Sequence, residues 1–153
     1  MPEDTNEIVE FFRSAIGRKL EGAPPLTAWL DGRIVSAEVG RIEVRFKTRP
    51  EMANPTGLLH GGIQAAIMDD VIGMTSATMG EDGFMIAIDL HTNFLGKLKV
   101  GENVLARAWV VRNGRRIAHA VCELVDDDGA VVSRGEANLL KTGFEPDYRK
   151  KME

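Results

Sequence analysis

The chain has little of several features that would place it in a specialised class of protein. It contains one cysteine, Cys122, so it cannot form an internal disulfide or a zinc site built on cysteines. It has no excess of basic residues: 19 Lys and Arg stand against 23 Asp and Glu, which argues against a broad nucleic-acid-binding surface. Its longest mostly apolar stretch, residues 61–79, contains Asp69, Asp70 and Gln64, which disfavours a membrane span.

The remaining composition is that of one ordinary globular domain. The chain has 153 residues, of which 44% are hydrophobic and 27% charged. Residues 1–10 carry four acidic side chains and no basic one, which is unlike a signal or transit peptide. We therefore expect a single domain over residues 1–153, in the cytoplasm, with neither nucleic acid nor membrane as a partner.

Hydrophobic periodicity predicts two helices and a set of strands. Apolar residues recur at helical spacing from Ile8 to Ile16 and predict an N-terminal helix over about residues 4–21, with Asp4 at its cap. A long central helix begins near Gly61. Strands are predicted at residues 33–39, 41–47, 84–94, 103–112, 116–125 and 130–140. This is an α+β pattern with an antiparallel sheet of about six strands, a core over about residues 30–142 and a charged tail at 145–153.

The central helix is apolar nearly all round. One face carries larger side chains such as Ile63, Ile67 and Met74. Another face carries small residues around Asp69, namely Gly62, Ala66, Gly73 and Ser76. Such a helix should be buried on all sides. A sheet covers only one side, so we expect a second copy of the chain to cover the other, as in a closed homodimer.

His60, Gly61 and Gly62 stand at the start of this helix. Unpaired backbone amides and the positive end of the helix dipole favour an oxygen that bears negative charge there, and the glycines allow a ligand close to the backbone. Asp69 follows Gly61 by eight residues, which separates them by about 12 Å along the axis. A water on Asp69 cannot reach a carbonyl held at Gly61 of the same helix. Two antiparallel helices from two subunits would bring the groups together.

Each of these residues also has a purely structural interpretation. The Gly61-Gly62 pair can be interpreted as a tight turn into the helix. Asn54, which precedes a proline, can be interpreted as a turn residue. Asp69 is open to reading either as a satisfied buried carboxylate or as a catalytic base. We expect Asp70 to be bonded to the backbone or to an arginine at a strand end. The scattered histidines and the single cysteine predict no metal site.

At this point the sequence resembles a known family. Residues 54–62 (Asn-Pro-Thr-Gly-Leu-Leu-His-Gly-Gly), with Asp69 nine residues after His60, are similar to the hotdog-fold acyl-CoA thioesterases, in the branch typified by the phenylacetate-pathway thioesterase. The similarity covers roughly residues 30–142. It continues through residues 88–95, Gly101 and the turns at 113–116 and 127–129.

The resemblance implies a curved sheet wrapped around the central helix, with two protomers pairing edge to edge and tetramers as a common assembly. It implies that the Gly61 N–H polarises the thioester carbonyl and that His60 and Asn54 shape that side of the site. Asp69 of the neighbouring subunit would act as general base on water or as nucleophile. In many relatives a Ser or Thr helps to place the water, where this chain has Ala87. Ser76 is the candidate to compensate.

The substrate would then be an acyl-CoA, with coenzyme A as part of the substrate and no other cofactor. Arg115 and Arg116, at a predicted hairpin, are candidates to hold its phosphates, and Met68, Met79, Phe84 and Met85 suggest an apolar acyl pocket. Two other functions remain open. Ala87 leaves room for a non-catalytic acyl-CoA-binding module, and a dehydratase or hydratase of the same fold would require a catalytic histidine beside a carboxylate.

Overall fold

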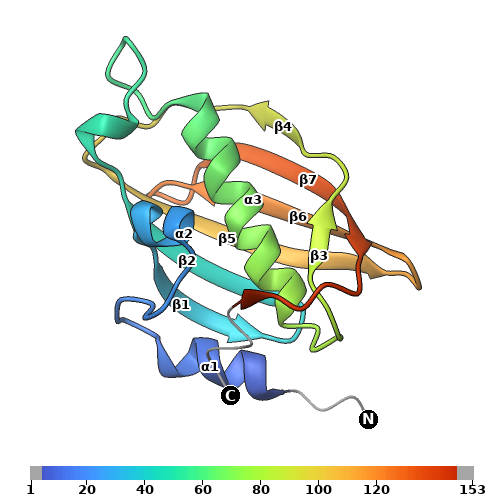
Figure 1. Cartoon of the computed structure of the whole chain (residues 1–153). Helices are drawn as coiled ribbons and strands as arrows, with labels where there is room; N and C mark the ends of the chain where they lie inside the picture. The colour runs from blue at the N-terminus through green and yellow to red at the C-terminus, as the bar shows by residue number, and fades with distance from the viewer. Residues whose placement is uncertain (1–4, 148–153) are drawn as a thin grey trace.

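The computed structural model describes residues 5–147, in which a curled antiparallel sheet wraps one long helix (Figure 1). The elements follow one another along the chain as α1 (Glu7–Ser14), α2 (Pro25–Leu30), β1 (Arg33–Glu38), β2 (Arg41–Lys47), the 3₁₀ turn η1 (Pro50–Met52), α3 (Gly61–Ala77), β3 (Met85–Ala87), β4 (His91–Phe94), β5 (Asn103–Asn113), β6 (Ile117–Val125) and β7 (Val131–Lys141). The predicted α+β fold with a helix inside a curved antiparallel sheet is confirmed.

The sheet has the strand order β1-β2-β5-β6-β7-β3, and β4 also pairs with β7. The strand predicted at residues 84–94 is therefore two strands, both at the same edge. Between them the Asp89 carboxylate accepts the backbone N–H of Asn138 at 2.9 Å, where a strand carbonyl would otherwise do so. The predicted count of about six strands matches six positions across the sheet, the last shared by β3 and β4.

Small side chains on the inner face of the sheet let α3 lie close to it. Five alanines of β5, β6 and β7 are fully buried there, at positions 106, 108, 118, 120 and 137. Gly135 serves the same purpose, because a Cβ at this residue would lie 2.8 Å from the sulfur of Met68 on α3. Ile67, Met68, Val71 and Ile72 of α3 are completely buried against this face. The sheet therefore covers one side of α3 tightly.

Within residues 5–147, the opposite side of α3 is covered less tightly. Gly62 and Asp69 are exposed, and Ala66 and Gly73 are half-buried. These residues lie at intervals of four, three and four, so they share one face of the helix. The small-residue face identified in the sequence is thus open from Gly62 to Gly73, whereas Ser76 at its end is buried.

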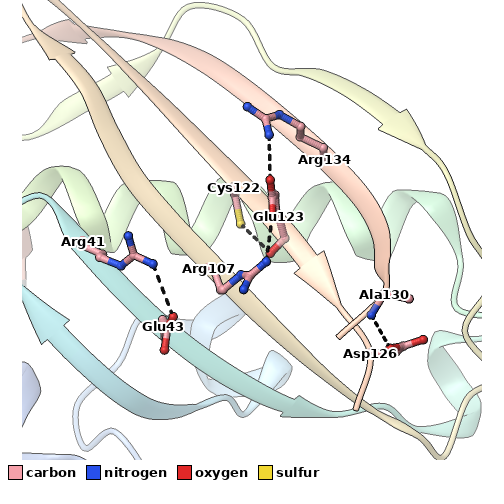
Figure 2. A network of polar contacts seen from close by, with 8 residues as sticks. All are labelled: Arg41, Glu43, Arg107, Cys122, Glu123, Asp126, Ala130 and Arg134. Carbon is pink, nitrogen blue, oxygen red and sulfur yellow. Dashed lines mark hydrogen bonds and ion pairs between the residues drawn. The ribbon is translucent and has the colours of Figure 1, made fainter. Parts of the chain in front are cut away.

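The outer face of the sheet carries a polar network that is separate from α3 (Figure 2). The Glu123 carboxylate bridges two arginines, with Arg107 at 2.9 Å and Arg134 at 2.7 Å. The Arg134 guanidinium also lies 5.7 Å from the ring centre of Trp109. Because Ala106 and Ala108 face α3, Arg107 between them points away from it. This network therefore ties β5, β6 and β7 together and lies on the side of the sheet away from the candidate site.

The N-terminal segment departs from the prediction in two places. The first helix begins at Glu7 with Asn6 as its cap and ends at Ser14, so the predicted extension to residue 21 is wrong. Asp4, the predicted cap, lies outside the described residues, as does the tail beyond residue 147. A second short helix, α2, begins at Pro25, where the sequence predicted only the end of a helix.

Candidate functional site

His60 caps the N-terminus of α3. Its Nδ1 accepts the backbone N–H of Gly62 at 2.9 Å, and its carbonyl accepts the N–H of Gln64 at 3.0 Å. Its own N–H donates to the Met52 carbonyl at 2.9 Å, which anchors the helix start to η1. Since Nδ1 is an acceptor here, the proton of the neutral ring lies on Nε2. His60 therefore shapes the helix start.

Gly61 is the first residue of α3, so its N–H has no acceptor within the helix. The helix dipole makes this position favourable for an oxygen that gains negative charge. A Cβ at Gly61 would lie 3.1 Å from the ring of Phe94, which covers the helix start from β4. A glycine thus allows the edge strand to pack closely against the start of α3.

Asn54 organises the loop that leads into α3. Its side-chain oxygen accepts the N–H of Thr56 at 2.8 Å, the hydroxyl of Thr56 at 2.7 Å and the N–H of Leu58 at 3.2 Å. The Leu59 N–H then donates to the Leu98 carbonyl at 2.7 Å. Asn54 therefore acts on this side of the site by fixing the loop before His60, in agreement with its interpretation as a turn residue.

Asp69 lies in the middle of α3, on the face that the sheet leaves open. It lines a cavity of about 480 Å³ between α3, α1, residues 20–27 and β3. The surrounding protein replaces water around its carboxyl group, and this desolvation raises its pKa. A carboxylate with a raised pKa is a stronger base, which suits it to take a proton from water.

Asp70 has a partner that the sequence did not indicate. The Thr27 hydroxyl of α2 donates to Asp70 Oδ1 at 2.7 Å, so the expected bond to the backbone or to an arginine is wrong. Its Oδ2 is buried and has no hydrogen-bond partner among residues 5–147. Burial raises the pKa of Asp70; the hydrogen bond from Thr27 opposes this shift and the charge of Asp69 adds to it.

The cavity brings Ala87 to the same wall as Asp69 but leaves Ser76 outside. Ala87 of β3 is exposed and lines the cavity. Ser76 is buried, and its hydroxyl donates to the Gly73 carbonyl within α3 at 2.7 Å. The Ser76 hydroxyl is therefore engaged inside α3 and outside the lining of the cavity, and its role in compensating for Ala87 stays a prediction.

Of the four residues expected in an acyl pocket, two line the cavity and two lie outside its lining. Phe84 and Met85 line the cavity, whereas Met68 packs against Gly135 in the core and Met79 lies beside Gly40. The walls that the sequence analysis missed come from the N-terminal segment, which contributes among others Ile8, Phe11, Phe12 and Thr27. The apolar spacing of α1 was visible in the sequence, but nothing in it indicated that α1 packs beside Asp69.

Arg115 and Arg116 lie in the loop between β5 and β6, and both are exposed. Asn113, at the end of β5, donates to Glu81 at 2.7 Å, and Glu81 follows the C-terminal end of α3. Gly61 begins this 17-residue helix, so the two arginines are near the opposite end of α3, about 25 Å away. One chain does not bring them together with Gly61.

Neither a membrane-spanning helix nor a cluster of metal-binding side chains is present among residues 5–147. No helix within residues 5–147 is long and apolar enough to cross a membrane. The same residues contain no group of three or more His, Cys, Asp or Glu side chains placed to hold a metal ion.

Comparison with known proteins places the chain in a family. The model of the family described as "Thioesterase superfamily" matches residues 56–133. Human acyl-coenzyme A thioesterase 13 is 25% identical over 103 residues, which cover 67% of this chain and 74% of the human protein. A phenylacetic acid degradation-related protein from Ralstonia eutropha JMP134 has a TM-score of 0.76 and 27% identity, covering 88% of this chain and 99% of that one.

A protein from Streptococcus mutans, solved with acetyl CoA bound, shares the fold. It has a TM-score of 0.70 and 21% identity, and the match covers 75% of this chain and 91% of that one. The family model spans the end of the loop before α3, the whole of α3 and the strands β3 to β6, and so includes His60, Gly61 and Asp69. The chain therefore belongs to the thioesterase superfamily and is a thioester hydrolase.

Proposed function

We propose that the protein hydrolyses an acyl-CoA thioester at a site shared between two subunits. The observation that carries this proposal is the placement of Gly61 and Asp69 on one helix, about 12 Å apart along its axis, with Asp69 on its uncovered face. The coenzyme A part of the substrate is supported by the human relative's name and by the acetyl CoA bound to the Streptococcus mutans protein.

In this mechanism the thioester carbonyl accepts a hydrogen bond from the Gly61 N–H of one subunit. Asp69 of the other subunit takes a proton from a water molecule, whose oxygen attacks the carbonyl carbon. The negative charge that develops on the carbonyl oxygen is stabilised by the Gly61 N–H and the helix dipole. The C–S bond then breaks, and the leaving thiolate takes the proton back from Asp69. The products are the free acid and coenzyme A.

A nucleophilic role for Asp69 uses the same geometry. The carboxylate would attack the carbonyl carbon, expel the thiolate and form a mixed anhydride that water then hydrolyses. A single turnover in H₂¹⁸O separates the two routes. Direct attack by water leaves Asp69 unlabelled, whereas attack of water on the Asp69 carbonyl of the anhydride places ¹⁸O in the aspartate, which mass spectrometry of the peptide detects.

The remaining binding residues are assigned by charge and position. Coenzyme A carries several phosphate charges, and a chain with a net charge of −4 needs local cations to hold them. Arg115 and Arg116 are two adjacent exposed cations. An antiparallel partner would bring its β5–β6 loop toward the Gly61 end of the first subunit, so we assign these arginines to the nucleotide. Gly62 leaves space beside the carbonyl, and Ala87 borders the water beside Asp69.

The assembly required is a homodimer, alone or paired into a tetramer. Its support is the free edge of the sheet at β3 and β4, which displays large apolar side chains: Phe84, Ile86, Ile88, Phe94 and Leu95. Exposed apolar groups beside an unpaired strand edge favour pairing with another strand. A second copy would supply that strand and would also cover the small-residue face of α3.

The experiment is a thiol-release assay over short, medium, long and aromatic acyl-CoAs, with Asp69→Asn as the test variant. General-base catalysis contributes about 10²–10⁴-fold, so Asp69→Asn should lower kcat by that order. Asn cannot accept the proton but keeps the size of the side chain, so acyl-CoA binding and folding should survive. Asp70→Asn is the matched control, with a smaller effect on kcat. Undiminished turnover by Asp69→Asn, or a parent that binds acyl-CoA without hydrolysing it, would contradict the proposal.

A further inference from the structure

The cavity beside Asp69 continues along α3 away from the proposed reaction centre. Its α3 residues are Asp69, Asp70, Gly73, Met74 and Ala77, which follow one another at the spacing of a single helix face. Asp69 and Ala77 are separated by eight residues, or about 12 Å along the axis. The cavity is therefore an elongated space with an ionisable group at one end and mainly apolar walls beyond it.

The N-terminal helix forms part of the wall of this space beside the C-terminal end of α3. Asn6 caps α1 and its side-chain amide also donates to the Thr78 carbonyl at 2.8 Å, so α1 is docked beside the C-terminal end of α3. Ile8 and Phe12 of α1 are buried in the core, while Phe11 is half-buried, and all three line the cavity. Alongside, the Thr27–Asp70 hydrogen bond holds α2 against α3.

Gly73 is the residue that keeps the space open. It lies inside α3, one turn beyond Asp69, where glycine is unfavourable compared with alanine. A Cβ built on Gly73 meets no atom within 4 Å, so packing within the chain gives no reason for the missing side chain. A larger residue here would project into the cavity between Asp69 and α1.

We infer that this cavity holds the acyl chain, that Gly73 keeps it open and Phe11 limits its length, and that the accepted chains are of medium length. The inference rests on the proposed function, because Asp69 then marks the thioester end. Each C–C bond of about 1.5 Å advances an extended chain by about 1.3 Å, so about 12 Å accommodates about nine carbons beyond the carbonyl. The acyl chain would lie in the subunit that supplies Asp69, and the carbonyl would be held by Gly61 of its partner.

The test compares ratios of kcat/KM for acetyl-, octanoyl- and palmitoyl-CoA. Gly73→Leu should lower the octanoyl-to-acetyl ratio by about tenfold or more, and Gly73→Ala by less, since hydrophobic pockets discriminate by such factors. Phe11→Ala should raise the palmitoyl-to-octanoyl ratio by about tenfold. Ile16→Ala is the control: this apolar residue follows α1, is 45% exposed and does not line the cavity. It should leave both ratios unchanged.

A binding measurement separates this inference from the proposed function. S-octyl-CoA and S-methyl-CoA are thioethers that cannot be hydrolysed, and calorimetry should show tighter binding of the octyl compound to the parent but not to G73L. If the parent binds S-octyl-CoA more tightly than S-methyl-CoA but hydrolyses no thioester, the proposed function is contradicted and the assignment of the cavity to the acyl chain is supported. If thioesters are hydrolysed with unchanged ratios in G73L and F11A, the length inference fails alone. Loss of the oligomer in G73L would assign the space to a second copy and overturn the inference.

Discussion

Asp69 and Asp70 are adjacent in sequence but face different surroundings. Asp69 lies on the open face of α3 beside the cavity, whereas Asp70 is turned toward α2 and is bonded to Thr27. An aspartate pair inside an apolar helix could be recognised from the sequence, and its helical position was enough to single out Asp69. The partner of Asp70 could not be predicted, because it belongs to a helix that the sequence analysis did not identify.

The buried Asp70 carboxyl predicts a pH-dependent stability. Its pKa in the folded protein is raised, mainly by burial, so the folded state holds the proton more strongly than the unfolded state. The free energy of unfolding should therefore fall as the pH rises from the unfolded pKa through the folded one, and level off above it. Asp70→Asn cannot titrate and its amide oxygen can still accept from Thr27. The variant should gain stability over the parent as the pH rises toward 7.

Urea unfolding at several pH values between about 4 and 7 measures this difference, starting near the ordinary pKa of an aspartate. Asp128→Asn, in the exposed turn between β6 and β7, is the control and should show no comparable trend. A difference between parent and Asp70→Asn that stays constant with pH would show that burial of this carboxyl does not govern the effect.

At the scale of elements, prolines can mark either the end of one helix or the first turn of the next. Pro24 and Pro25 were interpreted as the stop of the first helix, but Pro25 is the first residue of α2, a position that proline favours. Local sequence does not distinguish the end of one helix from the start of another here. What holds α2 in place is the hydrogen bond from Thr27 to Asp70, which lies 43 residues further along the chain. Likewise, alternation predicted one strand at 84–94, and only the position of Asn138 on β7 shows that Asp89 interrupts it.

Asn6 connects α1 to the rest of the molecule and should be sensitive to substitution. Its Oδ1 accepts the N–H groups of Ile8 and Val9, both at 3.0 Å, and its amide donates to Thr78. Loss of such an N-cap costs about 1–2 kcal/mol of unfolding free energy, so Asn6→Ala should lower stability by this amount. Ser14→Ala, on the exposed end of the same helix, should change it by about 0.5 kcal/mol or less. Equal losses in thermal unfolding would contradict the docking role of Asn6.

The β5–β6 loop provides a test of nucleotide recognition. Replacing Arg115 and Arg116 together by Ala should raise KM for acyl-CoA about tenfold, as expected for lost charge-assisted hydrogen bonds to phosphate. KM should change less for an N-acetylcysteamine thioester, which lacks the nucleotide. Arg45→Ala, an exposed arginine of β2, is the control. Equal changes for both substrates would indicate altered folding or packing instead.

At the scale of the whole molecule, the part of the chain from residue 5 to residue 147 exposes apolar side chains at the β3–β4 edge and small residues on one face of α3. We expect light scattering at micromolar concentration to give two or four times the chain mass of 16.8 kDa. A stable monomer at this concentration would remove the shared site. The sequence allowed this expectation because α3 is apolar nearly all round, and the structure narrows the expected contact to the face of α3 on which Gly62 and Asp69 are exposed.

The α+β architecture, the start of α3 at Gly61 and the exposed position of Asp69 could be predicted from the sequence, because they depend on local patterns of apolar, small and turn-forming residues. The cavity could not, because it forms where α1, α2 and β3 meet around one face of α3. Those contacts join residues far apart in the chain, such as Asn6 with Thr78. Hydrophobic spacing predicts that α1 buries one face, but it does not predict which part of the protein that face packs against.

Subunit complementation tests the shared site most directly. Asp69→Asn subunits are mixed with subunits that carry Asn54→Ala and His60→Ala, which disrupt the loop and the cap before Gly61 on the carbonyl side. In a mixed dimer one site would carry both defects, while the other would combine an intact Asp69 with an intact Gly61 side. The account predicts that verified mixed dimers recover up to about half of the parent activity, although each variant alone is impaired. Verified mixed dimers that recover no activity would contradict a site built from two subunits.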